Sequence, residues 1–250
     1  MYYNSNNIKI ADLGDVHITP TAPKKTGEVI FETIKKIRSS GVFPLIMGGD
    51  HSIAYYTIKG CLHGYLNGLK KEEVAIIHLD AHLDLETSYL DYPNIYHGNS
   101  FRKLIEDDII DGNNLFTIGV RGLIPSEIYQ YAKEKQVNLY TSKLVKRVGI
   151  DKVLADFKQH IEKHRIKAVY VSLDIDCITP SEVRGTGIPL EGGLCSEDIY
   201  RFVRGLGNVN TIGFEIVELA PKIDMSEFST LVAVNIFRNF LMFGLKMEES

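Results

Sequence analysis

The sequence lacks most of the features that mark secreted or membrane-bound proteins. It has only three cysteines in 250 residues, and Cys61, Cys177 and Cys195 follow no disulfide-like or metal-ligand spacing. No apolar run is long enough to span a bilayer, and residues 1–7 are too polar to form the core of a signal peptide. We therefore expect reduced thiols in a cytoplasmic protein, with Cys177 a small core residue despite its place beside Asp176.

A strong excess of one charge is also missing. The 28 basic and 32 acidic side chains give a net charge of -4, so neither nucleic acid nor an anionic membrane is expected as a partner. No linker, internal repeat or low-complexity segment divides the chain. With 44% hydrophobic residues, the chain can form one domain with a large core.

Short apolar runs alternate with longer helical patterns along the whole chain. The expected strands are Ile8–Leu13, Phe43–Met47, Val74–Leu79, Leu115–Val120, Asn138–Tyr140, Ala168–Leu173 and Thr211–Glu215. The expected helices are Lys25–Ser39, Ser52–Asn67, Ser100–Ile105, Pro125–Lys135, Val148–His164, Ser196–Leu206 and Glu227–Leu245. This alternation predicts a three-layer α/β/α fold with a mostly parallel sheet. In such folds the site lies beyond the carboxyl ends of the strands.

Two of the expected strands end in acidic clusters. The run 74–79 leads into Asp80, His82 and Asp84, whose alternate spacing in an extended chain directs all three to one side. The run 168–173 leads into Asp174 and Asp176 in the same way. Ionised groups at the end of a buried strand are costly unless something neutralises them, and a bound cation does so.

A third strand end adds another potential ligand. The run 43–47 leads into Gly48 and Gly49, which permit a tight turn, and His51 then stands at the start of a helix. Alone, Asp50 or His51 could merely cap a helix, and the spacing of Asp80, His82 and Asp84 alone is often that of a turn or a solvated loop. Together they offer four carboxylates and two imidazoles, a set that suits two Mn²⁺ ions sharing carboxylates better than one structural zinc.

These three segments resemble the ureohydrolase family, which includes arginases, agmatinases, guanidinobutyrases and formimidoylglutamases. The resemblance extends from about Asp12 to Leu245 and implies an arginase-like fold with two Mn²⁺ ions per chain. By this resemblance one ion is held by His51, Asp80, Asp84 and Asp174, and the other by Asp80, His82, Asp174 and Asp176. Asp80 and Asp174 would bridge the ions, with a hydroxide between them.

The same resemblance assigns roles to three residues around the metals. Glu218 would bind the substrate guanidinium through paired hydrogen bonds. His97 would contact the substrate and shuttle a proton, and Asp84 would pass that proton to the leaving amine. Thr186 would line the substrate pocket. Judged singly, Glu218 could be a surface carboxylate and His97 an ordinary loop residue.

The expected substrate is agmatine, cleaved to putrescine and urea. Arginases carry a serine and an acidic residue in the segments that correspond to 92–98 and 120–123, and this chain lacks both. Without those groups, the charged end of arginine would be poorly paired. His78 and the segment 220–224 look more like agmatinases. Arginase, guanidinobutyrase and formimidoylglutamase activity are the alternatives.

The chain also departs from the family pattern. Arg184 stands where family members usually have proline; it either binds a substrate carboxylate or, as we favour, points into solvent. We expect a single ureohydrolase domain over 1–250 that lacks the family's first strand-helix unit, whose strand lies inside the family's sheet. By resemblance we also expect a homo-oligomer, either a trimer or a hexamer.

Two other function classes deserve comparison. A metal-dependent phosphoesterase could use Asp15 and His17, but the later Gly-Asn-His-Glu type of segment that such enzymes carry is missing. A catalytically silent binding subunit is favoured by the missing first unit. The retained cluster of ligands argues against it, because a silent protein has no need of that charge.

Overall fold

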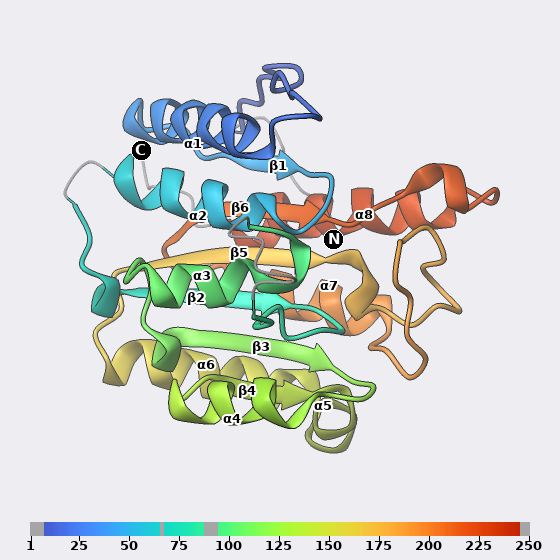
Figure 1. The fold of residues 1–250 in the computed structure, drawn as a ribbon. Helices are drawn as coiled ribbons and strands as arrows, with labels where there is room; N and C mark the ends of the chain where they lie inside the picture. The colour runs from blue at the N-terminus through green and yellow to red at the C-terminus, as the bar shows by residue number, and fades with distance from the viewer. Residues whose placement is uncertain (1–7, 66–67, 88–94, 246–250) are drawn as a thin grey trace.

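The computed structural model describes residues 8–65, 68–87 and 95–245, which form one parallel sheet between two layers of helices (Figure 1). The strands are β1 (Leu45–Met47), β2 (Val74–Leu79), β3 (Leu115–Val120), β4 (Asn138–Thr141), β5 (Ala168–Asp174) and β6 (Thr211–Val217). The helices are α1 (Pro23–Ser39), α2 (Ile53–His63), α3 (Ser100–Glu106), α4 (Ser126–Glu134), α5 (Ser142–Val148), α6 (Ile150–Lys163), α7 (Ser196–Arg204) and α8 (Phe228–Asn239). Within these residues, no helix has both the length and the apolar character needed to cross a membrane.

The six strands pair in the order β1-β6-β5-β2-β3-β4, and every pairing is parallel. All carboxyl ends therefore lie along the same edge of the sheet, which is on the right in Figure 1. The central strands β2 and β5 are buried along their whole length, as expected for a parallel sheet that is covered on both faces. The predicted three-layer α/β/α fold is confirmed.

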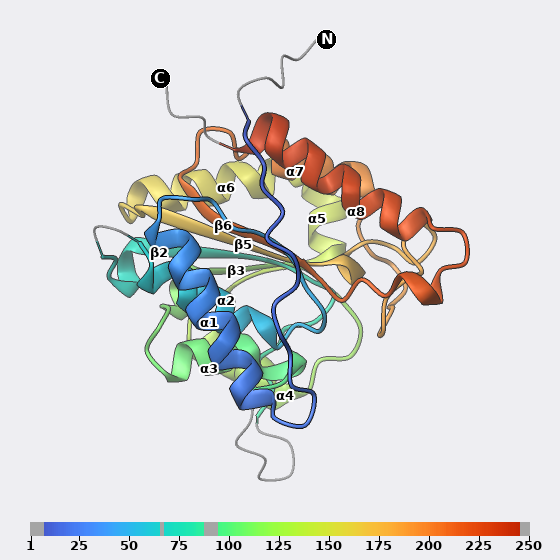
Figure 2. The same ribbon diagram turned by 90° about the horizontal axis from the view of Figure 1, so that it is seen from above.

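The helices divide between the two faces of the sheet, as Figure 2 shows: α1 to α4 cover one face and α5 to α8 the other. Side chains along β2 alternate between the two cores. Ala75, Ile77 and Leu79 join the core under α5 to α8, whereas Val74 and Ile76 join the core under α1 to α4. This alternation keeps the strand in register, because a slip of one residue would exchange the two faces.

The predicted strand Ile8–Leu13 is wrong, because this segment pairs with no strand in the described part of the chain. Its apolar residues gain little burial, since Ile10 is 72% exposed and Leu13 is 70% exposed. An alternating apolar pattern favours a strand only if a neighbour supplies the ladder and a core covers one face. β1, at the edge of the sheet, pairs only with β6 among the described residues.

Other elements are present but differ from expectation at their ends. β1 begins at Leu45 rather than at Phe43, consistent with the missing N–H of Pro44. α2 ends at His63, and residues 66–67 of the expected helix lie outside the described residues. The helix expected over Val148–His164 is α6, which begins at Ile150, after Gly149 with φ 86°. Val148 instead ends α5, a helix that the sequence did not predict. After Asn239, α8 continues as a π-helical turn over Phe240–Gly244.

Candidate metal centre

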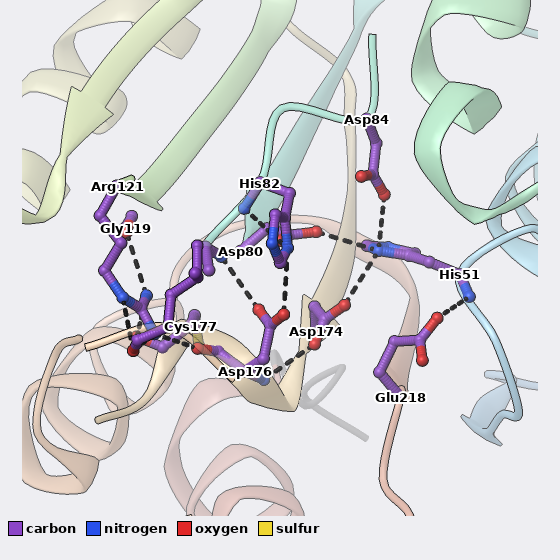
Figure 3. A network of polar contacts seen from close by, with 12 residues as sticks. His51, Asp80, His82, Asp84, Gly119, Arg121, Asp174, Asp176, Cys177 and Glu218 are labelled. Atoms are coloured by element: carbon purple, nitrogen blue, oxygen red, sulfur yellow. Dashed lines mark hydrogen bonds and ion pairs between the residues drawn. The ribbon is translucent and has the colours of Figure 1, made fainter. Parts of the chain in front are cut away.

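The side chains of the predicted metal ligands come together at the carboxyl edge of the sheet (Figure 3). Asp80, His82 and Asp84 follow β2, Asp174 ends β5, and Asp176 lies in the 3₁₀ turn that comes next. The sixth predicted ligand, His51, comes from the turn between β1 and α2. All six are buried or half-buried, which confirms that the three segments meet in one place.

His51 lies at the centre of a first group of potential ligands. Its Nδ1 atom is 3.0 Å from Asp80 Oδ2, 3.0 Å from Asp84 Oδ2 and 3.5 Å from Asp174 Oδ2. The other ring nitrogen, Nε2, lies 2.8 Å from the Ser172 hydroxyl. One nitrogen and three carboxylate oxygens therefore converge on one point, and the Ser172 contact fixes the ring that supplies the nitrogen.

A second group lies next to the first. His82 Nδ1 is 3.3 Å from Asp80 Oδ1 and 3.1 Å from Asp176 Oδ2. Asp80 thus belongs to both groups, with one oxygen in each. Asp174 contributes its Oδ2 atom to the first group, whereas its Oδ1 atom accepts a hydrogen bond from the Asp176 amide at 2.8 Å. The predicted role of Asp174 as a bridge between two ions therefore stays a prediction.

The first group fits a metal ion because two of its buried atoms have no other partner. Within the described residues, His51 Nδ1 and Asp84 Oδ2 are shielded from solvent and have no hydrogen-bond partner outside the cluster, where they face each other at 3.0 Å. A buried lone pair without a partner costs free energy, and several lone pairs that face one another cost more. A divalent cation satisfies all of them, and imidazole with carboxylates is a donor set that suits Mn²⁺.

The pKa values of the cluster show the same need for positive charge. Burial and the charge of Asp80 raise the pKa of Asp84 to about 7, and the same causes, in the same order, raise the pKa of Asp174 and of Asp176. Burial opposes the protonation of His82, but hydrogen bonds with Asp176 and Asp80 raise its pKa to about 11. Such shifts arise when carboxylates share a site without enough cations.

Backbone geometry holds the ligand loops in place. The amide of His82 donates to Asp80 Oδ1 at 2.6 Å, and the amide of Ala81 donates to Asp176 Oδ1 at 3.0 Å. The second bond links the loop after β2 to the loop after β5. Asp84 and Glu218 both have left-handed backbones, with φ 50° and φ 59°. Non-glycine residues in this conformation concentrate at functional sites, where the surrounding structure maintains them.

A cavity of about 260 Å³ opens beside the cluster. Its wall includes the metal-cluster residues His51, His82, Asp84, Asp174 and Asp176, together with Glu86, His97, Arg121, Glu218 and several apolar side chains. A cavity of this size suits a small molecule rather than a polymer. The cluster therefore lines a space that a small substrate can enter.

Glu218 is held beside the cluster by His51. Its Oε1 atom accepts a hydrogen bond from the His51 amide at 2.7 Å, and its own amide donates to Gly49 at 2.8 Å. Burial raises the pKa of Glu218. With one oxygen fixed by the backbone, the carboxylate presents a defined orientation to a substrate in the cavity.

The other predicted site residues lie at different depths. His97 is exposed and lines the cavity, next to Tyr96. Thr186 is 3% exposed and pairs with Leu219 in an isolated antiparallel β-bridge. It is not among the residues that line the cavity, so its predicted substrate contact stays a prediction. Arg184 is exposed and also absent from the lining, as the solvent-facing alternative predicted. Residues 92–94, used in the substrate argument, lie outside the described residues.

Sequence reasoning missed residues that support the ligands. Arg121 donates to the backbone oxygens of Asp176 at 2.6 Å and of Leu190 at 2.8 Å, and so ties the loop after β5 to the end of β3 (Figure 3). His78 Nε2 lies 2.7 Å from Asp80 Oδ2. Ser172 and the buried Glu215 stand behind His51. One signal was available: these are polar residues within, or directly after, otherwise apolar strands.

Comparison with known proteins identifies the family to which the chain belongs. A model of the arginase family matches residues 1–243. An agmatinase from Bacillus anthracis is 30% identical over 241 residues, which are 96% of this chain and 77% of that protein. A mitochondrial guanidino acid hydrolase from Homo sapiens is 28% identical over 236 residues, 94% of this chain and 64% of that protein. The crystal structure of formimidoylglutamase from Bacillus subtilis matches with a TM-score of 0.85 at 28% identity, covering 92% of this chain and 70% of that one. The chain belongs to the arginase family.

Proposed function

We propose that the protein is a dinuclear manganese hydrolase that cleaves a small guanidino compound to urea and an amine. The observation that carries this proposal is the shared position of Asp80, whose two oxygens belong to adjacent ligand groups beside a substrate-sized cavity. Two Mn²⁺ ions held by these groups would supply Lewis acidity and lower the pKa of a water molecule. The arginase-family membership supports the same chemistry.

Glu218 orients the substrate in this proposal. Because the His51 amide holds Oε1, the carboxylate can accept hydrogen bonds from a planar guanidinium at a fixed angle. Orientation of this kind places the guanidinium carbon in line for attack by water. Glu218 also carries the negative charge that a guanidinium needs for binding.

Asp84 and His97 handle protons in the proposed mechanism. Asp84 lies in the cluster and lines the cavity in which the leaving amine would form. His97 lies at the exposed side of the same cavity. The pair thus provides a path from the reacting nitrogen to bulk water, and the leaving amine is protonated along it.

The charges of the cavity wall favour agmatine as the substrate. Arg121 is the one arginine or lysine in the described lining, and its guanidinium is occupied by backbone oxygens. Glu86 adds a carboxylate to the wall, held by the Tyr96 hydroxyl at 2.7 Å. A distal ammonium group pairs with such a wall, whereas a distal carboxylate finds no free cation there. The agmatinase relative agrees with this choice.

The test is a comparison of four substrates with one Mn²⁺-loaded protein. Agmatine, arginine and 4-guanidinobutyrate are assayed for urea, and formimidoylglutamate for formamide, with Asp174→Asn as the control that removes a ligand. We expect urea chiefly from agmatine, and none from the control. Faster release from guanidinobutyrate would overturn the agmatine assignment. Tight manganese binding without any product would overturn the enzyme proposal in favour of a silent binding protein.

The proposed homo-oligomer, a trimer or hexamer, has a candidate surface on α8 and the turn before it. Met225, Phe228, Leu231 and Val234 are between 47% and 98% exposed and recur at intervals of about one helical turn. Contiguous exposed apolar side chains of this kind commonly mark protein interfaces. Light scattering after size-exclusion chromatography tests the assembly, and Leu231→Lys should shift it toward the monomer. A wild-type monomer would contradict the proposal.

A further inference from the structure

A row of buried polar residues crosses four neighbouring strands directly behind the metal ligands. Thr117 of β3 pairs in register with His78 of β2, His78 with Ser172 of β5, and Ser172 with Glu215 of β6. All four side chains are 0% exposed. We call these four residues the polar row. Because side chains alternate along a strand, Ser172 lies on the same side of the sheet as Asp174, two residues further on.

Two hydroxyl groups donate hydrogen bonds to the carboxylate at the end of the polar row. Ser172 donates its hydroxyl proton to Glu215 Oε1 at 2.7 Å, and Thr57 of α2 donates to Glu215 Oε2 at 2.7 Å. A carboxylate can only accept, and a serine has one proton to give. The Ser172 oxygen must therefore accept from its other partner, His51 Nε2, at 2.8 Å.

This direction determines which nitrogen of neutral His51 carries the proton. With the proton on Nε2, the lone pair of His51 is on Nδ1, the atom that lies 3.0 Å from both Asp80 and Asp84. A metal ion binds an imidazole only through a nitrogen that has a free lone pair. If Ser172 donated to His51 instead, the proton would move to Nδ1 and block the metal position.

We propose that Glu215, acting through Ser172, is a positioning residue that fixes the His51 tautomer needed for metal binding. The inference rests on the proposed function, because it requires that the cluster holds metal. It also accounts for a fully buried carboxylate with no ion-pair partner among the described residues, which would otherwise be a cost to the fold. Glu215 does not touch the substrate cavity in this scheme, so it is not a catalytic residue.

Two substitutions separate the hydrogen-bond role from packing and from charge. Glu215→Met fills the space but removes the acceptor, so Ser172 is expected to turn its proton toward His51. Glu215→Gln removes the charge but keeps an amide oxygen that can accept from Ser172, because Thr57 can donate to the Ile53 carbonyl 3.1 Å away instead. We expect Glu215→Met to weaken Mn²⁺ binding about 10- to 100-fold, as is typical when the partner of a metal-binding histidine is lost. Glu215→Gln should retain binding within a few-fold of the wild type.

The measurement is the Mn²⁺ dissociation constant, obtained by titration with detection of free Mn²⁺ by electron paramagnetic resonance. Thermal melts of the metal-free variants show whether each one folds, and Thr211→Val, an isosteric change on β6 away from the row, is the control. In a Ser172→Ala background, Glu215→Met should cause no further loss, because the two residues act in one chain.

Two outcomes would overturn the positioning role of Glu215. Equal binding by Glu215→Met and the wild type would leave packing as the role of this position. Equal losses in Glu215→Met and Glu215→Gln would assign the effect to charge and overturn the tautomer argument. A wild-type protein that binds no Mn²⁺ would instead overturn the proposed function, whereas the first two outcomes leave that function standing.

Discussion

The side chains of β2 and β5 alternate between the two faces of the sheet, and the two faces bury different chemistry. The face under α5 to α8 receives Ile77, Leu79, Val171 and Leu173, which pack in a large apolar cluster. The face under α1 to α4 begins with apolar residues at the amino ends of the strands. Toward the carboxyl ends it changes to the polar row and then to the metal ligands.

This difference separates what stabilises the fold from what the site requires. The apolar face gains free energy from burial without any need for partner groups. The polar face buries carboxylates and imidazoles whose cost must be offset by hydrogen bonds or by a metal ion. We therefore expect substitutions on the two faces to affect different measurements, and the following four predictions test that separation.

The largest effect on binding is expected from Asp174→Asn. Burial and the charges of Asp80 and Asp176 raise the pKa of Asp174 well above its ordinary value, so the metal-free protein favours the neutral form of this carboxyl. An asparagine resembles that neutral form, and the metal-free protein should unfold at nearly the wild-type denaturant concentration. Mn²⁺ affinity should fall at least about 100-fold, the upper end of losses from indirect partners. A large loss of metal-free stability would contradict the separation of the two faces.

Phe157→Ala on α6 is expected to have the opposite effect, which is a loss of stability without a loss of Mn²⁺ affinity. Phe157 is fully buried among apolar side chains, where it packs edge-on against Phe116 with ring centroids 5.0 Å apart. Its truncation should lower the free energy of unfolding by about 3–5 kcal/mol, as for other large-to-small changes in cores. Chemical denaturation measures this loss. The folded variant should bind Mn²⁺ like the wild type, and weakened binding would show that the faces are coupled.

The sequence predicted which six side chains come together because all six lie at or just after a strand end, where local spacing places them. The polar row was missed because its logic depends on register: Ser172 and Glu215 are far apart in the chain and meet only once β5 pairs with β6. The prediction of a strand at Ile8–Leu13 failed for a related reason. A strand requires a neighbour, and local apolar periodicity contains no information about whether one is available.

Removal of the metal should destabilise the folded protein by an amount that depends on pH. The pKa of Asp84 in the metal-free fold is about 7, above its ordinary 3.8. A carboxyl with a raised pKa contributes stability that is fully present below about pH 4 and is lost as the pH rises through about 7. His82, with a pKa of about 11, loses its contribution in the same direction but at higher pH. Metal-free protein should therefore become less stable on this face as the pH rises.

Bound Mn²⁺ replaces those protons, so the metal should stabilise the protein more at about pH 8 than at about pH 5. The measurement is the difference in melting temperature between samples with Mn²⁺ and samples with a chelator at each pH. Groups outside the cluster titrate equally in both samples, and their effects cancel in the difference. A shift of the same size at both pH values would show that the carboxylates do not exchange protons for metal.

The smallest effect, and the sharpest test of the boundary between the two kinds of core, is expected at Phe101 on α3. Its ring stacks on His78 with centroids 3.9 Å apart and meets the edge of His51 at 5.3 Å, so it is an apolar residue that touches the polar face. Phe101→Leu should cost about 1–2 kcal/mol of unfolding free energy, less than a truncation to alanine. If rigid packing helps to orient the two imidazoles, Mn²⁺ affinity should also fall by about two- to fivefold. The matched change Phe157→Leu should cost similar stability and leave the affinity unchanged. Equal affinities in both variants would mean that hydrogen bonds alone orient the ligands, and that the apolar residues of the polar face serve only the fold.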